Sequence, residues 1–311
     1  MLSRAAQRIY WAGRYLERAE NTARIVQQYS HLLLDLPDEV GVEWDELVAI
    51  FGAERTFQEQ GGASTDRQVL DFLLADANSG TSLLYSIRMA RDNFRNLRDL
   101  LPQESWESAN ELYQYARKEI GAQMSDENRF EVLSDCIGRC QQINGILMGT
   151  MSYNSPHFFL SLGQDIERAD MTSRIVDVAA AYLQQNERLV LRYGSTLWTN
   201  VLKSVSGFQM YRQYCQPQVE GLVVVDFLLN DQKFPRAVRA CVERAKQTAA
   251  WLPRAEHLVG ALERAEDSLP SPLPKHLDGA EVSRLMDTLQ KRLGDAHMAV
   301  VDTWFLPGDD A

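Results

Sequence analysis

The sequence predicts an all-α fold, organised as a duplicated helical bundle with a pseudo-two-fold internal repeat. Three observations lead to this prediction. Apolar residues recur at helical spacing along most of the chain, strand-like alternation is scarce, and one block of sequence is repeated about 150 residues later. With 311 residues, 45% of them hydrophobic, the chain is long enough to bury a sizeable core.

The first helix is predicted to span residues 2–34, a stretch with one glycine and no proline. At about 100° per residue, Ala12, Leu16 and Ala19 lie in one narrow arc, which is typical of an amphipathic helix. Pro37 should end this helix, because proline disfavours helical geometry in the residue before it. Further helices are predicted at residues 43–51, 66–76, 81–100, 104–120, 128–151, 158–191, 195–205, 219–230, 235–251, 254–266 and 280–305.

Two pairs of segments are similar in sequence. The segment 13–26 is GRYLERAENTARIV and the segment 163–176 is GQDIERADMTSRIV, so eight of fourteen positions are identical. The segment 71–76 (DFLLAD) likewise matches 226–231 (DFLLND) at five of six positions. Two copies of one amphipathic set of helices bury their apolar faces most simply against each other. We therefore expect two units, 1–150 and 151–311, packed together as one body.

Charge and hydropathy limit the partners of the chain. It has 32 basic and 43 acidic side chains, which gives a formal net charge of −11. Such a chain repels phosphate backbones, so a general nucleic-acid role is not expected. The N-terminus lacks the unbroken apolar run of a secretory signal, and the longest uncharged run, 141–164, contains too many polar residues for a membrane span. We expect a cytoplasmic protein without a membrane segment.

Three long blocks carry a family resemblance. They are MLSRAAQRIYWAGRYLERAENTAR at 1–24, ARDNFRNLRDLLPQESWESANELY at 90–113 and HFFLSLGQDIERADMTSRIVDV at 157–178. Together they closely resemble the alpha-E family, an all-helical bacterial domain named for its ER motif. The resemblance implies a gene context shared with circularly permuted ATP-grasp enzymes and transglutaminase-like proteins, which is interpreted as amide-bond formation or peptide modification. One departure is Gln164, which stands where the first copy has Arg14.

The repeated block places charged side chains on one face of each helix. In the first helix this face covers about a third of the circumference and lies opposite the alanine-rich arc. The second copy has charged residues at the same helical phases. The candidate binding residues on these faces are Arg14, Glu17, Arg18, Asn21 and Arg24 in the first copy, and Glu167, Arg168 and Arg174 in the second.

Two interpretations of these charged faces remain open. In the first, the side chains join the two halves of the protein, with Glu20 and Arg24, and Asp170 and Arg174, as acid–base pairs four residues apart. In the second, the faces form a polar pocket on the pseudo-axis that binds a charged substrate or the partner enzyme. On an exposed helix such a pair contributes about 0.2–0.5 kcal/mol, whereas a buried pair that loses one partner costs about 3–5 kcal/mol.

Four arginines, Arg88, Arg91, Arg95 and Arg98, form a stripe on the helix predicted at 81–100. Because like charges repel, we expect an acidic group to face this stripe. That group is either internal or a carboxylate or phosphate of a ligand or partner, which guanidinium groups bind in a bidentate manner. No adjacent aromatic ladder is predicted, which argues against nucleic-acid binding. The internal candidates are Asp71, Asp76, Glu104 and the ER glutamates.

Templates for metal and nucleotide sites are missing from the sequence. None of the five histidines has a glutamate three residues before it, as di-metal sites in bundles require. The four cysteines form no CxxC pair. Neither GxxxxGKS/T nor GxGxxG occurs, so the chain carries no phosphate-binding loop of these kinds. We expect no metal and no cofactor, and an ATP-dependent step would require another polypeptide.

The combined expectation, which rests on the family resemblance, is a helical partner subunit of a circularly permuted ATP-grasp amide ligase. A transglutaminase-like protein is a further candidate partner. Catalysis would lie mainly on the ligase, and the ER residues would form a polar site at the repeat interface. Two alternatives stay open. The chain is either an enzyme in its own right, with Glu17 or Glu167 as general acid or base, or a non-catalytic scaffold for protein interactions.

Overall fold

Helices make up all of the regular secondary structure in the part of the chain that the structure describes. The computed structural model describes residues 3–37, 43–62, 65–122, 124–125, 127–185, 187–274 and 276–305 of the 311-residue chain. No strand occurs in these residues, so the predicted all-α class is confirmed. None of the described helices combines the length and the apolar character that a membrane crossing requires.

The described residues form fourteen α-helices and two π-helical turns. One of these turns, η2, continues α4, and the other, η3, continues α14. The elements are α1 (Ser3–Asp35), α2 (Asp45–Ile50), α3 (Glu54–Glu59), α4 (Asp66–Leu70), η2 (Asp71–Ala75), α5 (Leu83–Asn96), α6 (Gln103–Ala122), α7 (Arg129–Thr150), α8 (Ser155–Gln185), α9 (Glu187–Ser204), α10 (Phe208–Tyr214), α11 (Gly221–Asn230), α12 (Val238–Ala249), α13 (Glu256–Asp267), α14 (Gly279–Val300) and η3 (Val301–Phe305).

Most predicted helices are present, with three differences. The sequence does not predict α3 and α10, because helices of six and seven residues are too short to display a helical period. The prediction of one helix over 158–191 is wrong, since α8 ends at Gln185 and α9 begins at Glu187. Helical spacing continues across this boundary in the sequence, so periodicity could not locate it. The boundary residue, 186, lies outside the described residues.

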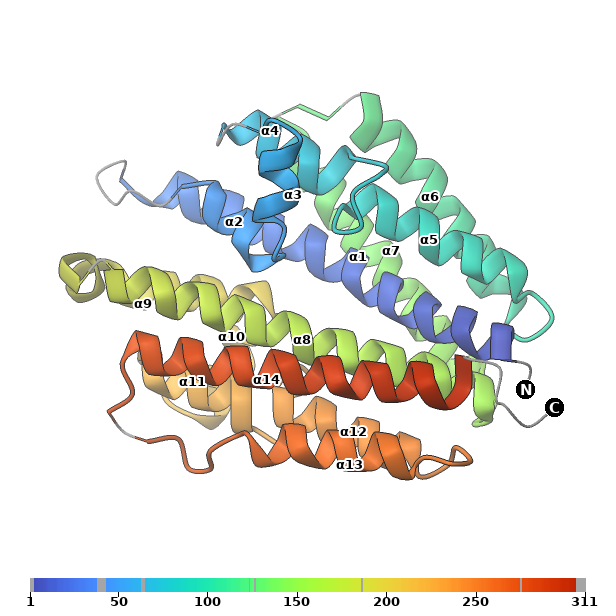
Figure 1. Cartoon of the computed structure of the whole chain (residues 1–311). Helices are drawn as coiled ribbons and strands as arrows, with labels where there is room; N and C mark the ends of the chain where they lie inside the picture. Colours follow the sequence, from blue (N-terminus) through green and yellow to red (C-terminus); the bar gives the residue numbers. More distant parts are fainter. Residues whose placement is uncertain are drawn as a thin grey trace.

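Two long helices, α1 and α8, form the centre of the molecule (Figure 1). They run in the same direction and pack along each other. Helices α5 and α7 pack on α1, and α12 and α14 pack on α8. The contact between α1 and α8 therefore joins an upper group of helices to a lower one.

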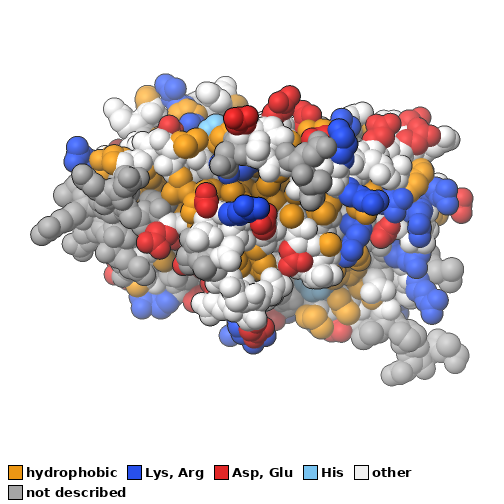
Figure 2. Space-filling view, turned by 90° about the horizontal axis from the view of Figure 1, so that it is seen from above, with side chains coloured by type: hydrophobic (Ala, Val, Ile, Leu, Met, Phe, Trp, Pro, Cys, Tyr) orange, Lys and Arg blue, Asp and Glu red, His pale blue; other side chains and the backbone are white. Residues whose placement is uncertain are grey.

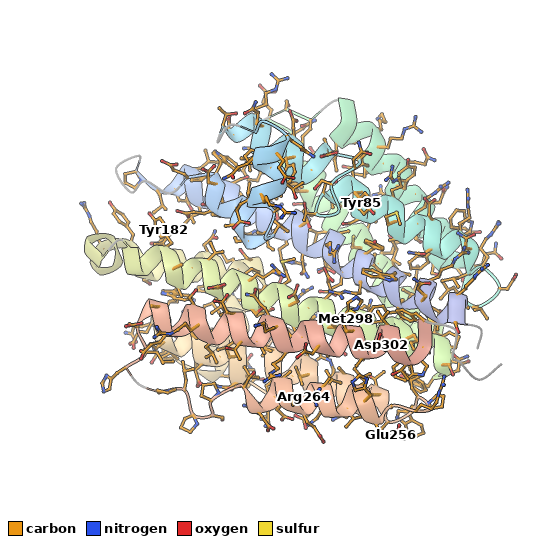
Figure 3. The ribbon with its side chains drawn as sticks, viewed as in Figure 1. Tyr85, Tyr182, Glu256, Arg264, Met298 and Asp302 are labelled. Atoms are coloured by element: carbon orange, nitrogen blue, oxygen red, sulfur yellow. The ribbon has the colours of Figure 1, made fainter. Side chains whose placement is uncertain are left out.

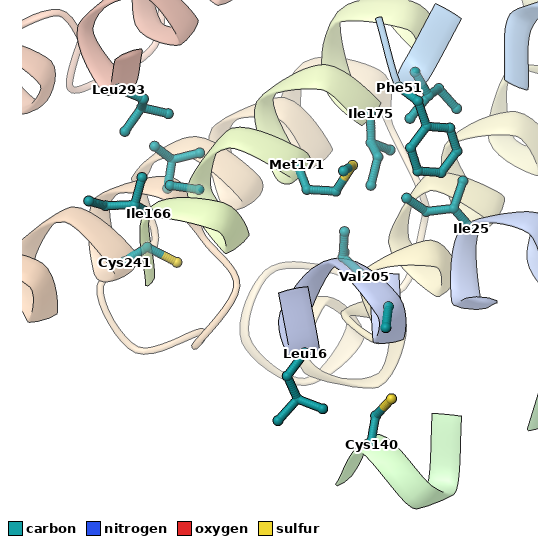
Figure 4. Packing of buried hydrophobic residues seen from close by; sticks show 14 of the residues in the cluster. Leu16, Ile25, Phe51, Cys140, Ile166, Met171, Ile175, Val205, Cys241 and Leu293 are labelled. Carbon is teal, nitrogen blue, oxygen red and sulfur yellow. The ribbon is translucent and has the colours of Figure 1, made fainter. Parts of the chain in front are cut away.

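Apolar side chains fill the space on both sides of this central contact. Figure 4 shows Ile166 of α8 beside Cys241 of α12 and near Leu293 of α14, while Leu16 of α1 lies toward Cys140 of α7. All five of these side chains are buried. Each central helix is thus anchored to its own neighbours by hydrophobic burial, which is the main favourable contribution to folding.

Two glycines set how closely α1 and α8 approach each other. A methyl group on Gly13 would overlap the carbonyl oxygen of Leu160, and a methyl group on Gly163 would overlap the carbonyl oxygen of Tyr10. Only a residue without a Cβ atom allows such a close approach of two backbones. The two glycines occupy corresponding positions of the repeated segments. The two glycines therefore let α1 and α8 pack closely enough for charged side chains elsewhere on the two helices to form ion pairs.

Replacing either glycine with alanine tests this constraint. We expect Gly13→Ala and Gly163→Ala each to lower the free energy of unfolding by about 1–3 kcal/mol, because the two helix backbones must move apart to make room for the methyl group. Urea unfolding followed by circular dichroism measures the loss.

The control is Gly145→Ala in the middle of α7, where an added Cβ atom meets no other atom within 4 Å. There we expect a gain of about 0.5–1 kcal/mol, because alanine is the better helix former. Equal stability of Gly13→Ala and Gly145→Ala would show that the close approach is unimportant.

Candidate functional site

The charged residues of the two repeated segments meet where α1 lies along α8. The dipeptide Glu17-Arg18 lies on α1 and the dipeptide Glu167-Arg168 lies on α8. Each glutamate is bonded by at least one arginine of the opposite helix. We call this set of bonded side chains the ER seam. Its members are Arg14, Glu17, Arg18, Asn21, Glu167, Arg168 and Arg236.

Glu167 of α8 is held by two arginines of α1. Arg14 donates from Nε to Oε2 of Glu167 at 2.6 Å. Arg18 forms a bidentate pair, donating from Nε to Oε1 at 2.5 Å and from Nη2 to Oε2 at 3.0 Å. Two parallel hydrogen bonds fix the relative orientation of guanidinium and carboxylate as well as their distance.

Glu17 of α1 is held in the reverse sense by Arg168 of α8. Arg168 donates from Nε to Oε1 of Glu17 at 3.0 Å and from Nη2 to Oε2 at 2.5 Å. A second guanidinium reaches Glu17 from Arg236, which donates from Nη1 to Oε1 at 2.7 Å. Asn21 adds a hydrogen bond from Nδ2 at 3.3 Å. The two ER dipeptides therefore bind each other reciprocally.

Both glutamates are removed from water and remain ionised. Glu17 is 0% exposed and Glu167 is 1% exposed. Burial alone would raise the pKa of each carboxyl, but the two guanidinium groups bonded to it outweigh burial and lower its pKa to about 2. A general acid or base works best with a pKa near the operating pH. The arrangement thus favours a structural role for Glu17 and Glu167 over proton transfer.

A second group of ion pairs extends the seam on both sides. Glu20 accepts from Arg24 at 2.6 Å and from Arg236 at 2.9 Å, so the predicted pairing of Glu20 with Arg24 is confirmed. Asp165 of α8 accepts from Arg244 of α12, at 2.6 Å from Nη2 and 3.1 Å from Nε. The seam is thereby tied to α12 and to the loop before it.

Arg236 and Arg244 are the residues that sequence reasoning missed. Arg236 is 219 positions from Glu17, and Arg244 is 79 positions from Asp165. No local spacing could have linked them. The only sequence signal was indirect: buried carboxylates need positively charged partners, and the two repeated segments hold five arginines for five carboxylates, too few to supply two for each.

The charged face of α1 is buried, as is the alanine-rich arc opposite it. Ala12 and Ala19 are buried as predicted, and so are Arg14, Glu17 and Asn21. The reason is the central position of α1, which is packed by α5, α7, α8 and α9 on different sides. A helix in such a position buries polar groups only when they are paired.

The remaining predicted site residues lie outside the seam. Arg174 pairs with Asp170 at 3.0 Å, as the spacing predicted. Its guanidinium lies beside Gly52, where an added Cβ atom would be 2.7 Å from Nη1. Arg88, Arg91 and Arg95 lie on α5 and do not reach the ER glutamates.

The internal acidic partners expected for the arginine stripe on α5 do not pair with it. Within the described residues, the stripe forms one ion pair, from Arg91 to the adjacent Asp92 at 3.0 Å. Figure 2 shows Lys and Arg side chains gathered toward one end of the upper face, with acidic side chains among them. The pairings proposed with Asp71, Asp76, Glu104 and the ER glutamates do not form.

Aromatic rings take the place of the acidic partners. The Arg88 guanidinium lies 5.2 Å from the ring centre of Tyr85, which Figure 3 labels near the start of α5. The Arg91 guanidinium lies 5.5 Å from Trp106 and 5.1 Å from Tyr113 on α6. The attraction of a guanidinium to a ring face offsets part of the repulsion along the stripe. Trp106 and Tyr113 belong to the neighbouring helix α6, which packs on α5.

Among the described residues, no group of three or more His, Cys, Asp or Glu side chains is placed to hold a metal ion. The acidic residues of the seam are each engaged by arginine instead. The chemistry that this donor set supports is the binding of carboxylates by guanidinium groups.

This fold and site define an all-helical protein organised around two Glu-Arg dipeptides buried between its central helices. A family model for Alpha-E, described as a predicted alpha-helical domain with a conserved ER motif, matches residues 1–305. The chain therefore belongs to the Alpha-E family. No curated protein and no solved structure matches it.

Replacing the ER glutamates with glutamine tests the role of the seam. At pH 7 we expect Glu17→Gln and Glu167→Gln each to lower the free energy of unfolding by about 3–5 kcal/mol, because two buried guanidinium groups lose their counter-charge. The carboxyls protonate near 4.5 in the unfolded chain and near 2 in the folded one. Their stabilisation is therefore complete above pH 4.5 and is lost as the pH falls toward 2. Urea unfolding at several pH values should show the variants approaching the wild type over this range.

Glu59→Gln is the matched control. Glu59 pairs with Arg55 at 3.4 Å and its side chain is 66% exposed, so its removal should cost less than about 1 kcal/mol. The structural role is refuted when Glu17→Gln and Glu167→Gln destabilise the protein no more than Glu59→Gln does.

Proposed function

We propose that the chain is a non-catalytic helical subunit that works with an ATP-grasp-type amide ligase in peptide or amino-acid modification. The observation that carries this proposal is the state of the ER glutamates, each of which is buried, ionised and bonded by two arginines. Glutamates in this state stabilise the packing of the helices, so the bond-forming reaction would take place on another polypeptide. The resemblance noted in the sequence supplies the candidate ligase, a circularly permuted ATP-grasp protein.

We also propose that the chain arose by duplication of one helical unit, with copies at 1–150 and 151–311. The repeated segments support this, and so do the reciprocal contacts of residues that correspond in the two copies. Glu17 binds Arg168 while Arg18 binds Glu167. A two-fold relation between two copies produces reciprocal contacts of this kind.

The arginine stripe on α5 is the proposed surface for an acidic partner or ligand. Arg88, Arg91 and Arg95 have few carboxylate partners of their own, and two of their guanidinium groups are oriented by aromatic rings. Oriented guanidinium groups lose less conformational freedom when they bind a carboxylate or phosphate. We propose a cytoplasmic location for this assembly, with a transglutaminase-like protein as a second partner.

Two other functions lead to different experimental results. An enzyme that used Glu17 or Glu167 as acid or base would lose its turnover in the Glu→Gln variants while its melting temperature stayed unchanged. A scaffold without a ligase partner would bind other proteins with no ATP-dependent product. The burial of both glutamates favours the ligase-subunit proposal over the first of these alternatives.

ATP turnover by the purified chain is the direct test. We expect the chain alone to hydrolyse no ATP and to ligate no amino acids, because its charged centre is filled by its own ion pairs. Mixed with a circularly permuted ATP-grasp protein from the same organism, the chain should elute as a complex in gel filtration. ATP consumption and amide formation should then depend on both proteins. ATP turnover by the isolated chain, or ligation that proceeds equally well without it, would reject the proposal.

A further inference from the structure

A cavity of about 330 Å³ lies between α12 and the N-terminal half of α8. Arg168 of the ER seam and Arg244 of α12 line its polar side, together with Asp165. Tyr153, before α8, and Trp251, after α12, line its apolar side. We call it the α8–α12 cavity. At this cavity the ER seam, through Arg168, borders an open space.

The two arginines of the cavity retain donors for a ligand. Arg168 uses Nε and Nη2 on Glu17, and its Nη1 atom lies 3.9 Å from Asp165, beyond hydrogen-bond distance. Arg244 uses Nε and Nη2 on Asp165. No acceptor for Nη1 of either residue is found among the described residues. A planar guanidinium with one free edge is suited to bind an oxygen anion.

The charges connected to the cavity are not balanced. One continuous set of ion pairs runs from the cavity into the protein, and it contains four guanidinium groups and three carboxylates. It therefore has room for one more negative charge, although the chain as a whole is acidic. Its members are Arg24, Arg168, Arg236, Arg244, Glu17, Glu20 and Asp165.

Exposed apolar side chains gather at the mouth of the same cavity. Tyr153 is 78% exposed and Trp251 is 73% exposed. The ring of Trp251 lies parallel to Phe158, with 6.0 Å between ring centres. Met148, another exposed apolar residue, also lines the cavity. Large exposed apolar residues around a pocket are typical of binding surfaces, and aromatic rings provide stacking area at low entropic cost.

His157 gives a second, independent sign of a missing ligand group. It lines the cavity and is buried, and its Nδ1 atom is buried without a hydrogen-bond partner. Burial lowers the pKa of His157, so the ring is neutral at pH 7 and adds no charge to the cavity. Buried polar atoms in folded proteins are almost always partnered. His157 is therefore a polar residue of the cavity wall whose Nδ1 atom has no protein partner.

We infer that the α8–α12 cavity binds the C-terminal carboxylate of a peptide that ends in an aromatic residue. The carboxylate accepts from the Nη1 atoms of Arg168 and Arg244, which are not hydrogen-bonded to Asp165, and the aromatic side chain stacks on Trp251. A cavity of about 330 Å³ is at the lower end of the range for small-ligand sites, which suits one or two terminal residues. This binding is a property of the chain alone and does not depend on the proposed ligase partner.

A carboxylate fits the cavity better than a phosphate. A phosphomonoester has close to two negative charges at pH 7, and the Asp165 carboxylate stands between the two arginines and repels the second charge. A single carboxylate matches the single unbalanced guanidinium. In a peptide, the C-terminal carboxylate and the aromatic side chain belong to the same residue. The side chain can therefore contact Trp251 while the carboxylate binds the arginines.

Fluorescence anisotropy of a labelled peptide tests the inference. The probe is Gly-Gly-Gly-Phe with fluorescein on its N-terminus, and the comparison is the same peptide with a C-terminal amide. We expect the full chain to bind the carboxylate form at least tenfold more tightly than the amide. Trp251→Ala, a change at an exposed position that leaves the core intact, should weaken binding of the carboxylate form at least tenfold.

Met298→Ala is the matched control, because Met298 is another exposed apolar residue, on α14, 51% exposed and labelled in Figure 3. It should bind the peptide like the wild type. Inorganic phosphate at millimolar concentration should not displace the peptide. Absence of saturable binding, equal binding of the amide, displacement by phosphate, or a Trp251→Ala variant that binds like Met298→Ala would each overturn the inference.

Discussion

The reciprocal pairing of Glu17 with Arg168 and of Glu167 with Arg18 is the interaction on which the rest of the structure depends. Each carboxylate is taken out of water, which is costly unless a cation accompanies it. In both cases that cation comes from the other central helix. Neither α1 nor α8 can therefore be buried without its partner in place. The close approach at Gly13 brings the two backbones near enough for this to happen.

Apolar packing and ion pairing have different roles in this arrangement. The hydrophobic contacts of α1 with α7, and of α8 with α12 and α14, supply most of the stability but tolerate small shifts of one helix along another. Bidentate guanidinium–carboxylate pairs do not tolerate such shifts, because their two parallel hydrogen bonds fix both the distance and the relative orientation of the two groups. We infer that the seam sets the register of the two central helices. The proposed functions build on this fixed centre, with the ligand cavity at its edge.

The all-α class and most helices could be predicted from sequence because apolar spacing is a local signal. The meeting of the two ER dipeptides was anticipated by the repeat, which paired Glu17 with Glu167 and Arg18 with Arg168 as equivalent residues. The contributions of Arg236 and Arg244 could not be predicted, since they arise from tertiary contacts with α12 and the loop before it. The same is true of the rings of Trp106 and Tyr113, which replace the expected acidic partners of the α5 arginines.

A double-mutant cycle between Glu17 and Arg168 tests the central claim most directly. The single variants Glu17→Gln and Arg168→Gln and the double variant are compared with the wild type by urea unfolding. We expect a coupling free energy of at least about 2 kcal/mol, because the effect of each side chain depends largely on the other. Single effects that add to within about 0.5 kcal/mol would show that the two residues act independently and that their pairing does not hold the central helices together.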